Sequence, residues 1–110
     1  MSSRDYLGEF EHIVVLAVMR LGDQAYGVTV RQEIAARIGR DVSVGAIYAT
    51  LDRLEAKGYV NSRLGEPTAE RGGRSKRFFC VTAKGVSAVN RTHRALLSMS
   101  KGLNLVARYS

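Results

Sequence analysis

Apolar residues recur at helical spacing along three stretches of the N-terminal half of the chain. From about Gly8 to Leu21 they lie three or four positions apart, and from about Tyr26 to Ile38 they recur at every fourth position. Both patterns predict amphipathic helices with one buried face. Gly39 is a suitable end for the second helix, because glycine tolerates the left-handed backbone that closes many helices.

A third helix is predicted from Ser43 to Lys57, closed by Gly58. Ser43 is a favourable N-cap, because its hydroxyl can accept a hydrogen bond from a free N–H of the first turn. Only a few residues separate this helix from the second one, so the two must meet through a short turn, as in a helix-turn-helix. The predicted buried stripe of the third helix consists of Ile47, Leu51 and Leu54.

The second half of the chain predicts a β-hairpin. Residues 59–64 show partial alternation of apolar and polar side chains, and residues 77–81 are rich in β-forming side chains. The segment between them, Gly65 to Lys76, is polar and holds Gly72-Gly73, which lets a hairpin tip turn sharply. This segment is therefore expected to be the basic loop of the hairpin.

Thr82 is a predicted cap for a last helix, from about Ala83 to Ala107. Its pattern has a three-and-four spacing that predicts a contact with a partner helix. The positions of that spacing are Val86, Val89, His93, Leu96, Ser100 and Leu103.

The element order predicts an α+β fold that is mainly α, a winged helix-turn-helix with an additional C-terminal dimerisation helix. We expect residues 1–82 to form the DNA-binding domain and residues 83–110 to form the dimerisation helix.

The distribution of charge points to a polyanionic partner. The formal net charge is +7, all ten acidic residues lie at or before Glu70, and residues 71–110 hold nine basic residues. The longest apolar run, residues 13–19, is far short of the roughly 20 residues of a membrane helix, and the N-terminus lacks the core of a signal peptide. We therefore expect a cytoplasmic protein that binds double-stranded DNA and no membrane.

The third helix and the basic loop carry the candidate DNA contacts. The N-terminal residues of a recognition helix reach base edges in the major groove, and here they are small or weakly polar, which predicts modest base readout. Arginines on the loop can follow the phosphate backbone or enter a narrow minor groove, with Arg74 the first choice. Two alternatives stay open: an interhelix position for Tyr48 and a solvated basic loop. The candidate DNA-binding residues are Ser43, Ala46, Tyr48, Ala49, Thr50, Arg53, Arg71, Gly73, Arg74 and Lys76.

No residues group as catalytic chemistry would need. His12 and His93 are far apart in the sequence, and Cys80, the single cysteine, has no companion at metal-ligand spacing. We expect no enzymatic activity, no catalytic residues, no metal and no cofactor.

Three segments of the chain resemble the PadR family of bacterial transcriptional regulators. They are Tyr26-Gly27, Gly45 to Val60, and Gly72 to Gly85. Ala49 departs from the family, which commonly has proline after the tyrosine, and Ser75 replaces a frequent proline after the loop arginine.

The resemblance implies a homodimeric repressor that binds an inverted-repeat operator. By family pattern, Ser43, Tyr48, Arg74 and Lys76 would lie at the DNA, and the last helix would pair with its counterpart while the first helix contributes. The candidate dimerisation residues are Phe10, Val86, Val89, His93, Leu96 and Leu103.

A small aromatic or hydrophobic effector releases some family members from DNA. Here such a compound would enter between the first and last helices, although we favour ordinary dimer core for the same side chains. The candidate lining residues are Tyr6, Phe10, Leu96, Met99 and Leu103. The alternative function is a winged-helix protein–protein interaction module with non-specific DNA affinity. A winged helix of the MarR type is a second alternative, but it usually needs longer flanking helices.

Overall fold

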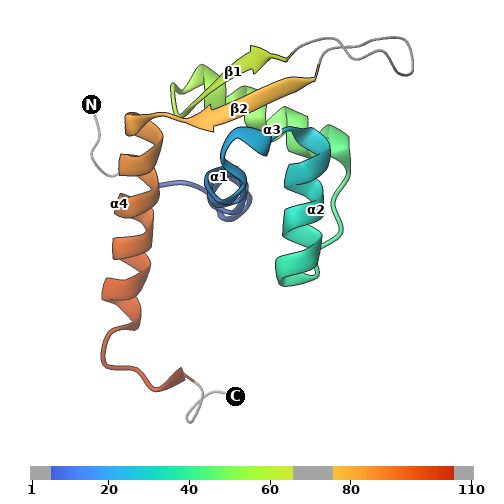
Figure 1. Ribbon diagram of the computed structural model, residues 1–110. Helices are drawn as coiled ribbons and strands as arrows, with labels where there is room; N and C mark the ends of the chain where they lie inside the picture. Colours follow the sequence, from blue (N-terminus) through green and yellow to red (C-terminus); the bar gives the residue numbers. More distant parts are fainter. Residues whose placement is uncertain (1–5, 66–75, 106–110) are drawn as a thin grey trace.

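The computed structural model describes residues 6–65 and 76–105 of the chain (Figure 1). Their order of elements confirms the predicted mainly helical fold with a small hairpin, and the predicted bounds of the first three helices hold to within one or two residues. In chain order the elements are α1 (Glu9–Leu21), a 3-10 turn (Gly22–Gln24), α2 (Gly27–Ile38), α3 (Val44–Ala56), β1 (Val60–Leu64), β2 (Arg77–Val81) and α4 (Ala83–Ser100).

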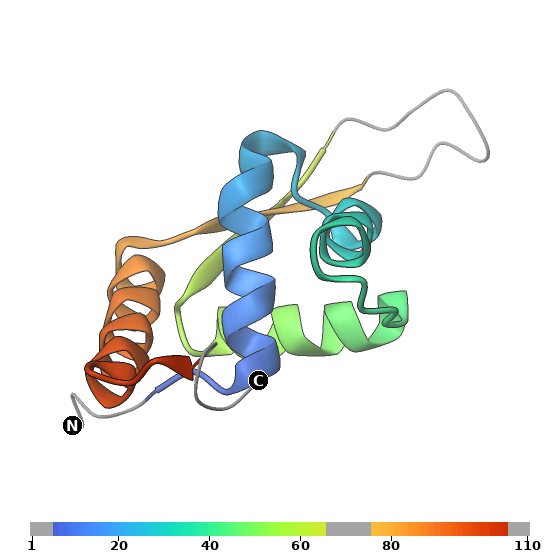
Figure 2. The ribbon, with the colours of Figure 1, turned by 90° about the horizontal axis from the view of Figure 1, so that it is seen from below.

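The helices enclose a single core with α1 at its centre. Figure 2 shows α1 passing between α4 on one side and α2 on the other, while α3 lies across one end of α1. The hairpin of β1 and β2 closes the core from above in the view of Figure 1. Three helices and the hairpin contribute its largest fully buried apolar side chains, which are Val14, Val15, Val18, Val30, Ile47, Leu51, Leu54 and Val60.

The helix ends follow the capping chemistry of the sequence. Ser43 Oγ accepts a hydrogen bond of 3.0 Å from the backbone N–H of Ala46, which confirms the predicted cap of α3. Gly39 closes α2 with φ of +67°, a left-handed conformation that a side chain would strain. Thr82 caps α4 by accepting from Gly85 N–H at 3.0 Å.

The hairpin is tied to the start of α2. Its strands are antiparallel, with Val60 opposite Val81 at one end and Leu64 opposite Arg77 at the other. The backbone N–H of Phe79 donates to the carbonyl of Ala25 at 2.8 Å. Movement of the hairpin relative to α2 would therefore break this backbone hydrogen bond as well as packing.

The last helix differs from the prediction in its length. It ends at Ser100 rather than near residue 107, because the chain leaves the helical conformation at Lys101 and Gly102 follows with φ of +85°. Leu103 therefore lies beyond the helix, and its predicted place in a helical contact was wrong. Val89 was also wrongly placed, because its side chain is 6% exposed within the core of its own domain.

The first half of α4 belongs to the same core as α1. Gly85, Ala88, Val89 and Thr92 are buried, and Thr92 Oγ1 accepts from the backbone N–H of Leu7 at 2.9 Å. The division into domains at residue 82 stays a prediction. Over the two described ranges, none of the helices has the length and apolarity to cross a membrane.

The close approach of Gly85 in α4 to the backbone of Tyr59 predicts the effect of a substitution on stability. A Cβ at Gly85 would overlap the carbonyl of Tyr59, which is backbone and cannot move aside cheaply. We expect Gly85→Ala to lower the free energy of unfolding by about 1–3 kcal/mol, as overpacked sites do. Urea denaturation at fixed protein concentration measures it.

Gly45→Ala is the matched control, because a Cβ there meets only Ser43 Oγ at 3.9 Å. It should raise the free energy of unfolding by about 0.5–1 kcal/mol through helix propensity. Equal effects of the two substitutions would contradict the contact.

Candidate nucleic-acid interface

The outward face of α3 is built from small side chains. Glycine and alanine predominate there, so another molecule can approach the helix backbone closely. The exposed residues of α3 are Gly45, Ala46, Ala49, Asp52, Arg53 and Ala56. Ser43, at the cap, is exposed as well. Of the candidate DNA contacts, Ser43, Ala46, Ala49 and Arg53 are therefore at the surface.

Thr50 is not part of this face. Its side chain is 1% exposed, and its Oγ1 accepts from Arg53 Nη2 at 3.1 Å. It lies three residues after Ile47 and four before Leu54, so helical spacing puts it on the buried side. The sequence interpretation of Thr50 as a DNA contact was wrong for that reason.

Tyr48 connects α3 to α2 and to the hairpin. Its ring is half-buried, with its centroid 6.3 Å from that of Phe79. The ring also covers Gly27, where any Cβ would overlap it. The ring of Tyr48 thus occupies the interhelix position that the sequence left open as an alternative. Position 27 must be glycine for the ring to pack in this way.

Cations and aromatic rings stack at the end of the hairpin that adjoins its loop. The ammonium of Lys76 is 4.8 Å from the centroid of the Tyr26 ring, and the guanidinium of Arg63 is 4.8 Å from that of Phe78. The rings of Tyr26 and Phe78 meet edge to face at 5.3 Å. Lys76 was identified from the sequence, but Arg63 was missed. Arg63 could have been found from the strand pairing, because it lies directly opposite Phe78.

Arg77 joins the hairpin to α3. Its guanidinium donates to Asp52 Oδ1 at 2.9 Å and to Glu55 Oε1 at 2.6 Å. Ser62 Oγ donates to the other carboxylate oxygen of Glu55 at 2.8 Å. The hydrogen bond from Ser62, and then Arg77, lower the pKa of Glu55. The guanidinium of Arg77 is therefore paired with carboxylates of its own domain.

The cations on the other flank of α3 are held by α1. Glu11 Oε2 lies 3.1 Å from Lys57 Nζ and 3.9 Å from Arg53 Nε. The first turn of α1 also reaches the turn between α2 and α3, because Glu9 pairs with Arg40 at 2.8 Å. Three carboxylates, Glu11, Asp52 and Glu55, therefore neutralise cations around the recognition helix.

Several predicted contacts lie outside the described residues. They are the loop residues Arg71, Gly73 and Arg74. Lys76, at the end of the loop, is described and exposed.

The predicted dimerisation residues do not share one surface. Phe10 is half-buried, and the guanidinium of Arg40 lies 5.1 Å from its ring centroid. Val86, His93 and Leu96 are exposed on α4. They stand apart from Phe10, which faces the turn between α2 and α3.

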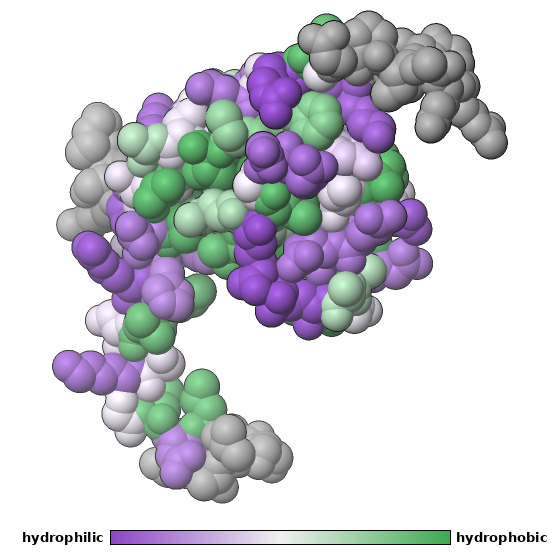
Figure 3. Space-filling model, viewed as in Figure 1, coloured by the Kyte–Doolittle hydropathy of each residue, from purple (hydrophilic) through white to green (hydrophobic). Residues whose placement is uncertain are grey.

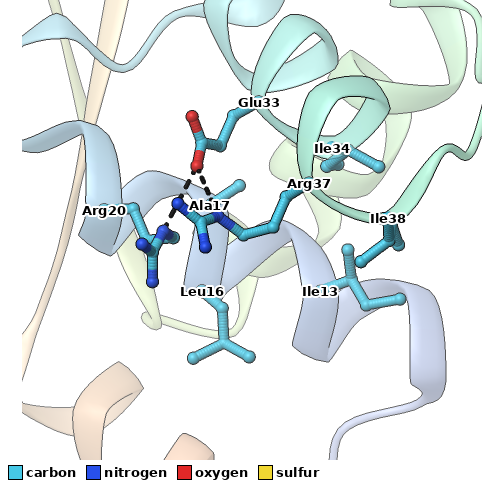
Figure 4. A pocket seen from close by; sticks show the side chains of 8 residues that line it. All are labelled: Ile13, Leu16, Ala17, Arg20, Glu33, Ile34, Arg37 and Ile38. Atoms are coloured by element: carbon cyan, nitrogen blue, oxygen red, sulfur yellow. Dashed lines mark hydrogen bonds and ion pairs between the residues drawn. The ribbon is translucent and has the colours of Figure 1, made fainter.

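Two grooves flank α1. The groove between α1 and α4 has a volume of about 490 Å³, and Tyr6 and Leu96 line it, but Phe10, Met99 and Leu103 do not. His12 also lines it with an Nδ1 atom that is buried and has no partner among the described residues. Burial, and then the nearby His93, lower the pKa of His12. The groove between α1 and α2, of about 190 Å³, has an apolar floor and the ion pairs of Glu33 at its rim (Figure 4).

Within residues 6–65 and 76–105, no three histidine, cysteine or acidic side chains are grouped as metal ligands.

The chain matches one family model over residues 15–91, that of the "Transcriptional regulator PadR-like family". None of the curated protein sequences matches it.

Solved structures extend the likeness in fold. A chain of the complex structure of hsRosR-S4 is 27% identical, with a TM-score of 0.63, and the match covers 90% of this chain and 77% of that one. A PadR family regulator from Clostridium difficile R20291 is 20% identical with a TM-score of 0.65, over 86% of this chain and 97% of the other. F93 from STIV, a winged-helix DNA-binding protein, is 18% identical with a TM-score of 0.67, over 89% and 98%. The fold is therefore the winged helix.

The packing of Tyr48 predicts the effect of a single methyl group. Gly27→Ala would displace the Tyr48 ring and with it the first turns of α3. We expect binding to duplex DNA to weaken at least tenfold, while Gly8→Ala, whose Cβ would meet only Glu11 Oε1 at 3.9 Å and whose φ of −64° suits any residue, leaves it unchanged. Fluorescence anisotropy measures both, and unaltered binding by Gly27→Ala would contradict the positioning of α3 by Tyr48.

The Glu55 cluster predicts a dependence of stability on pH. Because its folded pKa lies below the unfolded value, the stabilisation is present above the unfolded pKa of about 4.3 and is lost as the pH falls through the folded pKa. Arg77→Ala should therefore cost most stability at neutral pH, with a difference from wild type that shrinks below about pH 4. Thermal unfolding across that range measures it, and a constant difference would contradict the electrostatic part of the contact.

Proposed function

The chain belongs to the PadR-like family of transcriptional regulators, and we propose that it is a sequence-specific repressor that binds an inverted-repeat operator as a homodimer. Members of this family are transcriptional regulators rather than enzymes, and the winged helix is their DNA-binding fold. Repression, the symmetric operator and the homodimer are the parts that we propose for this chain.

The observation that carries the proposal is the small outward face of α3. Because Gly45, Ala46 and Ala49 have almost no side chain, the helix can lie deep in a major groove, where Ala49 would meet thymine methyl groups. Ser43 accepts from the helix with its oxygen, which leaves its O–H to donate to a phosphate. Tyr48 holds the helix at the angle for this contact.

The basic side chains supply the phosphate contacts in this proposal. Arg71 and Arg74 would follow the DNA backbone or the minor groove with Gly73 allowing a close approach, and Lys76 would contact the backbone beside them. Arg53 would reach a phosphate from the flank of α3 when the phosphate displaces it from Glu11.

The free end of α4 supports a homodimer. The stripe of α4 that packs into its own core passes through Gly85, Ala88, Val89 and Thr92, and continues on the same face to Leu96 and Met99. These last two side chains are 63% and 80% exposed. Figure 3 shows apolar surface on the part of α4 that extends beyond the rest of the domain. We propose that a second copy covers this stripe and brings two α3 helices roughly 34 Å apart, one turn of DNA.

A small aromatic or hydrophobic effector would enter the groove between α1 and α4. Its volume of about 490 Å³ is in the range of small-molecule sites, and it adjoins the proposed contact of the two copies. Binding there would change the angle between α4 and α1 and thereby release the operator.

Selection from randomised duplex DNA tests the proposal. We expect a two-fold-symmetric consensus with half-sites about 10 base pairs apart, because each α3 would read one half-site. Retention without a consensus would overturn sequence-specific binding and favour the alternative, a protein-docking module with non-specific DNA affinity. Arg74→Ala should weaken binding to all sequences alike, since in this proposal Arg74 would contact phosphate.

The dimer contact makes a separate prediction. Met99→Glu places a charge on the exposed stripe of α4 and should shift the protein from dimer to monomer in analytical ultracentrifugation. Ser98→Glu is the matched control, because Ser98 is exposed in the same turn but lies about 100° around the helix from Met99, off the apolar stripe. A dimer that survives Met99→Glu would place the contact elsewhere.

A further inference from the structure

We propose that Glu11 of α1 is a positioning residue that holds Arg53 and Lys57 back from DNA phosphates and so limits sequence-independent DNA binding. The inference rests on the proposed function, because it assumes that α3 lies in the DNA groove.

Glu11 is placed for this role by its position in the first turn of α1. It lies three residues before Val14 and four before Val15, on the face of α1 that packs into the core. Its side chain is 13% exposed, and the N–H of Gly8 donates to its Oε1 at 3.3 Å. The carboxylate is therefore held in one orientation, with Oε2 left for the cations of α3.

Arg53 and Lys57 lie one turn apart on the flank of α3 that faces α1. Their side chains are 57% and 49% exposed, so both border solvent on the side where DNA would pass. Without Glu11 the two charges would repel each other and would be free to turn toward a polyanion. A phosphate must instead compete for them with a carboxylate that has little water around it.

The competition between Glu11 and phosphate affects the electrostatic part of the free energy of DNA binding. Contacts to phosphate supply nearly all of the affinity for random DNA, whereas base contacts supply the discrimination. The base-facing side of α3 offers small side chains and no arginine, asparagine or glutamine at its N-terminal end. With modest base readout, weaker phosphate contacts keep the affinity for random DNA low, because random DNA offers little else to bind.

The test compares Glu11→Gln with wild type on a random duplex over 50–200 mM salt. The amide keeps the size of the side chain and can still accept from Gly8, but it no longer pairs with the cations. We expect log K against log salt to become steeper by about 1–2, because each recruited cation adds about 0.9 to the slope. Binding at 100 mM salt should tighten about tenfold or more.

Glu33→Gln is the matched control. Glu33 pairs with two arginines, Arg20 at 3.2 Å and Arg37 at 3.0 Å, so the substitution removes the same charge and releases the same number of cations (Figure 4). Those cations lie in the groove between α1 and α2, and Arg20 is near the end of α1 opposite to Glu11. The slope should stay at the wild-type value.

Two results would overturn the proposal. One is an unchanged slope in Glu11→Gln. The other is a steeper slope that persists when Arg53→Ala and Lys57→Ala are added, since the gain must pass through these two side chains. A loss of fold stability alone would lower the active fraction but not the slope. If wild type selects an operator and Glu11→Gln keeps its slope, the role of Glu11 fails while the proposed function stands. If wild type binds no DNA, both fail.

Discussion

The contact of the Tyr48 ring with Gly27 and Phe79 is the constraint on which the arrangement of this domain depends. One aromatic side chain on α3 touches the first residue of α2 and the second strand of the hairpin. The same strand is bonded to the chain just before α2 through Phe79 and Ala25. Recognition helix, helix two and hairpin therefore move as one body, and a glycine is the only residue that leaves room for the ring.

Acidic side chains determine where the basic side chains around the recognition helix point. The chain carries a net charge of +7, yet Glu11, Asp52 and Glu55 pair with three of the cations nearest to α3. Surface pairs of this kind contribute little to stability. Their main effect is on where a positive side chain points, and so on which cations remain for another molecule. In the described residues, Lys76 and Arg63 lie over aromatic rings and carry no acid partner.

Much of this fold could be predicted from local signals. The cap at Ser43 and the stop at Gly39 act through their own backbones, so a few neighbouring residues determine them. Thr50 was misplaced because a small polar side chain fits either face of a helix, and only packing shows which one it takes. The end of α4 was missed because apolar spacing continues through Leu103 while the backbone turns at Gly102. The ion pairs of Glu11 join residues 42 and 46 positions apart, which no periodicity reveals.

Thr82 is the one residue between β2 and α4, and its hydroxyl donates to the carbonyl of Gly58 at 2.6 Å while its backbone N–H donates to Tyr59 at 3.0 Å. No hinge therefore separates the long helix from the strand that enters it. Since α4 has 18 residues and a length of roughly 27 Å, a tilt of a few degrees at its base becomes a displacement of about 2 Å at its free end. If two such helices were in contact, each would be rigidly joined to its own domain. The crossing angle of the pair would then set the distance between the two DNA-facing surfaces.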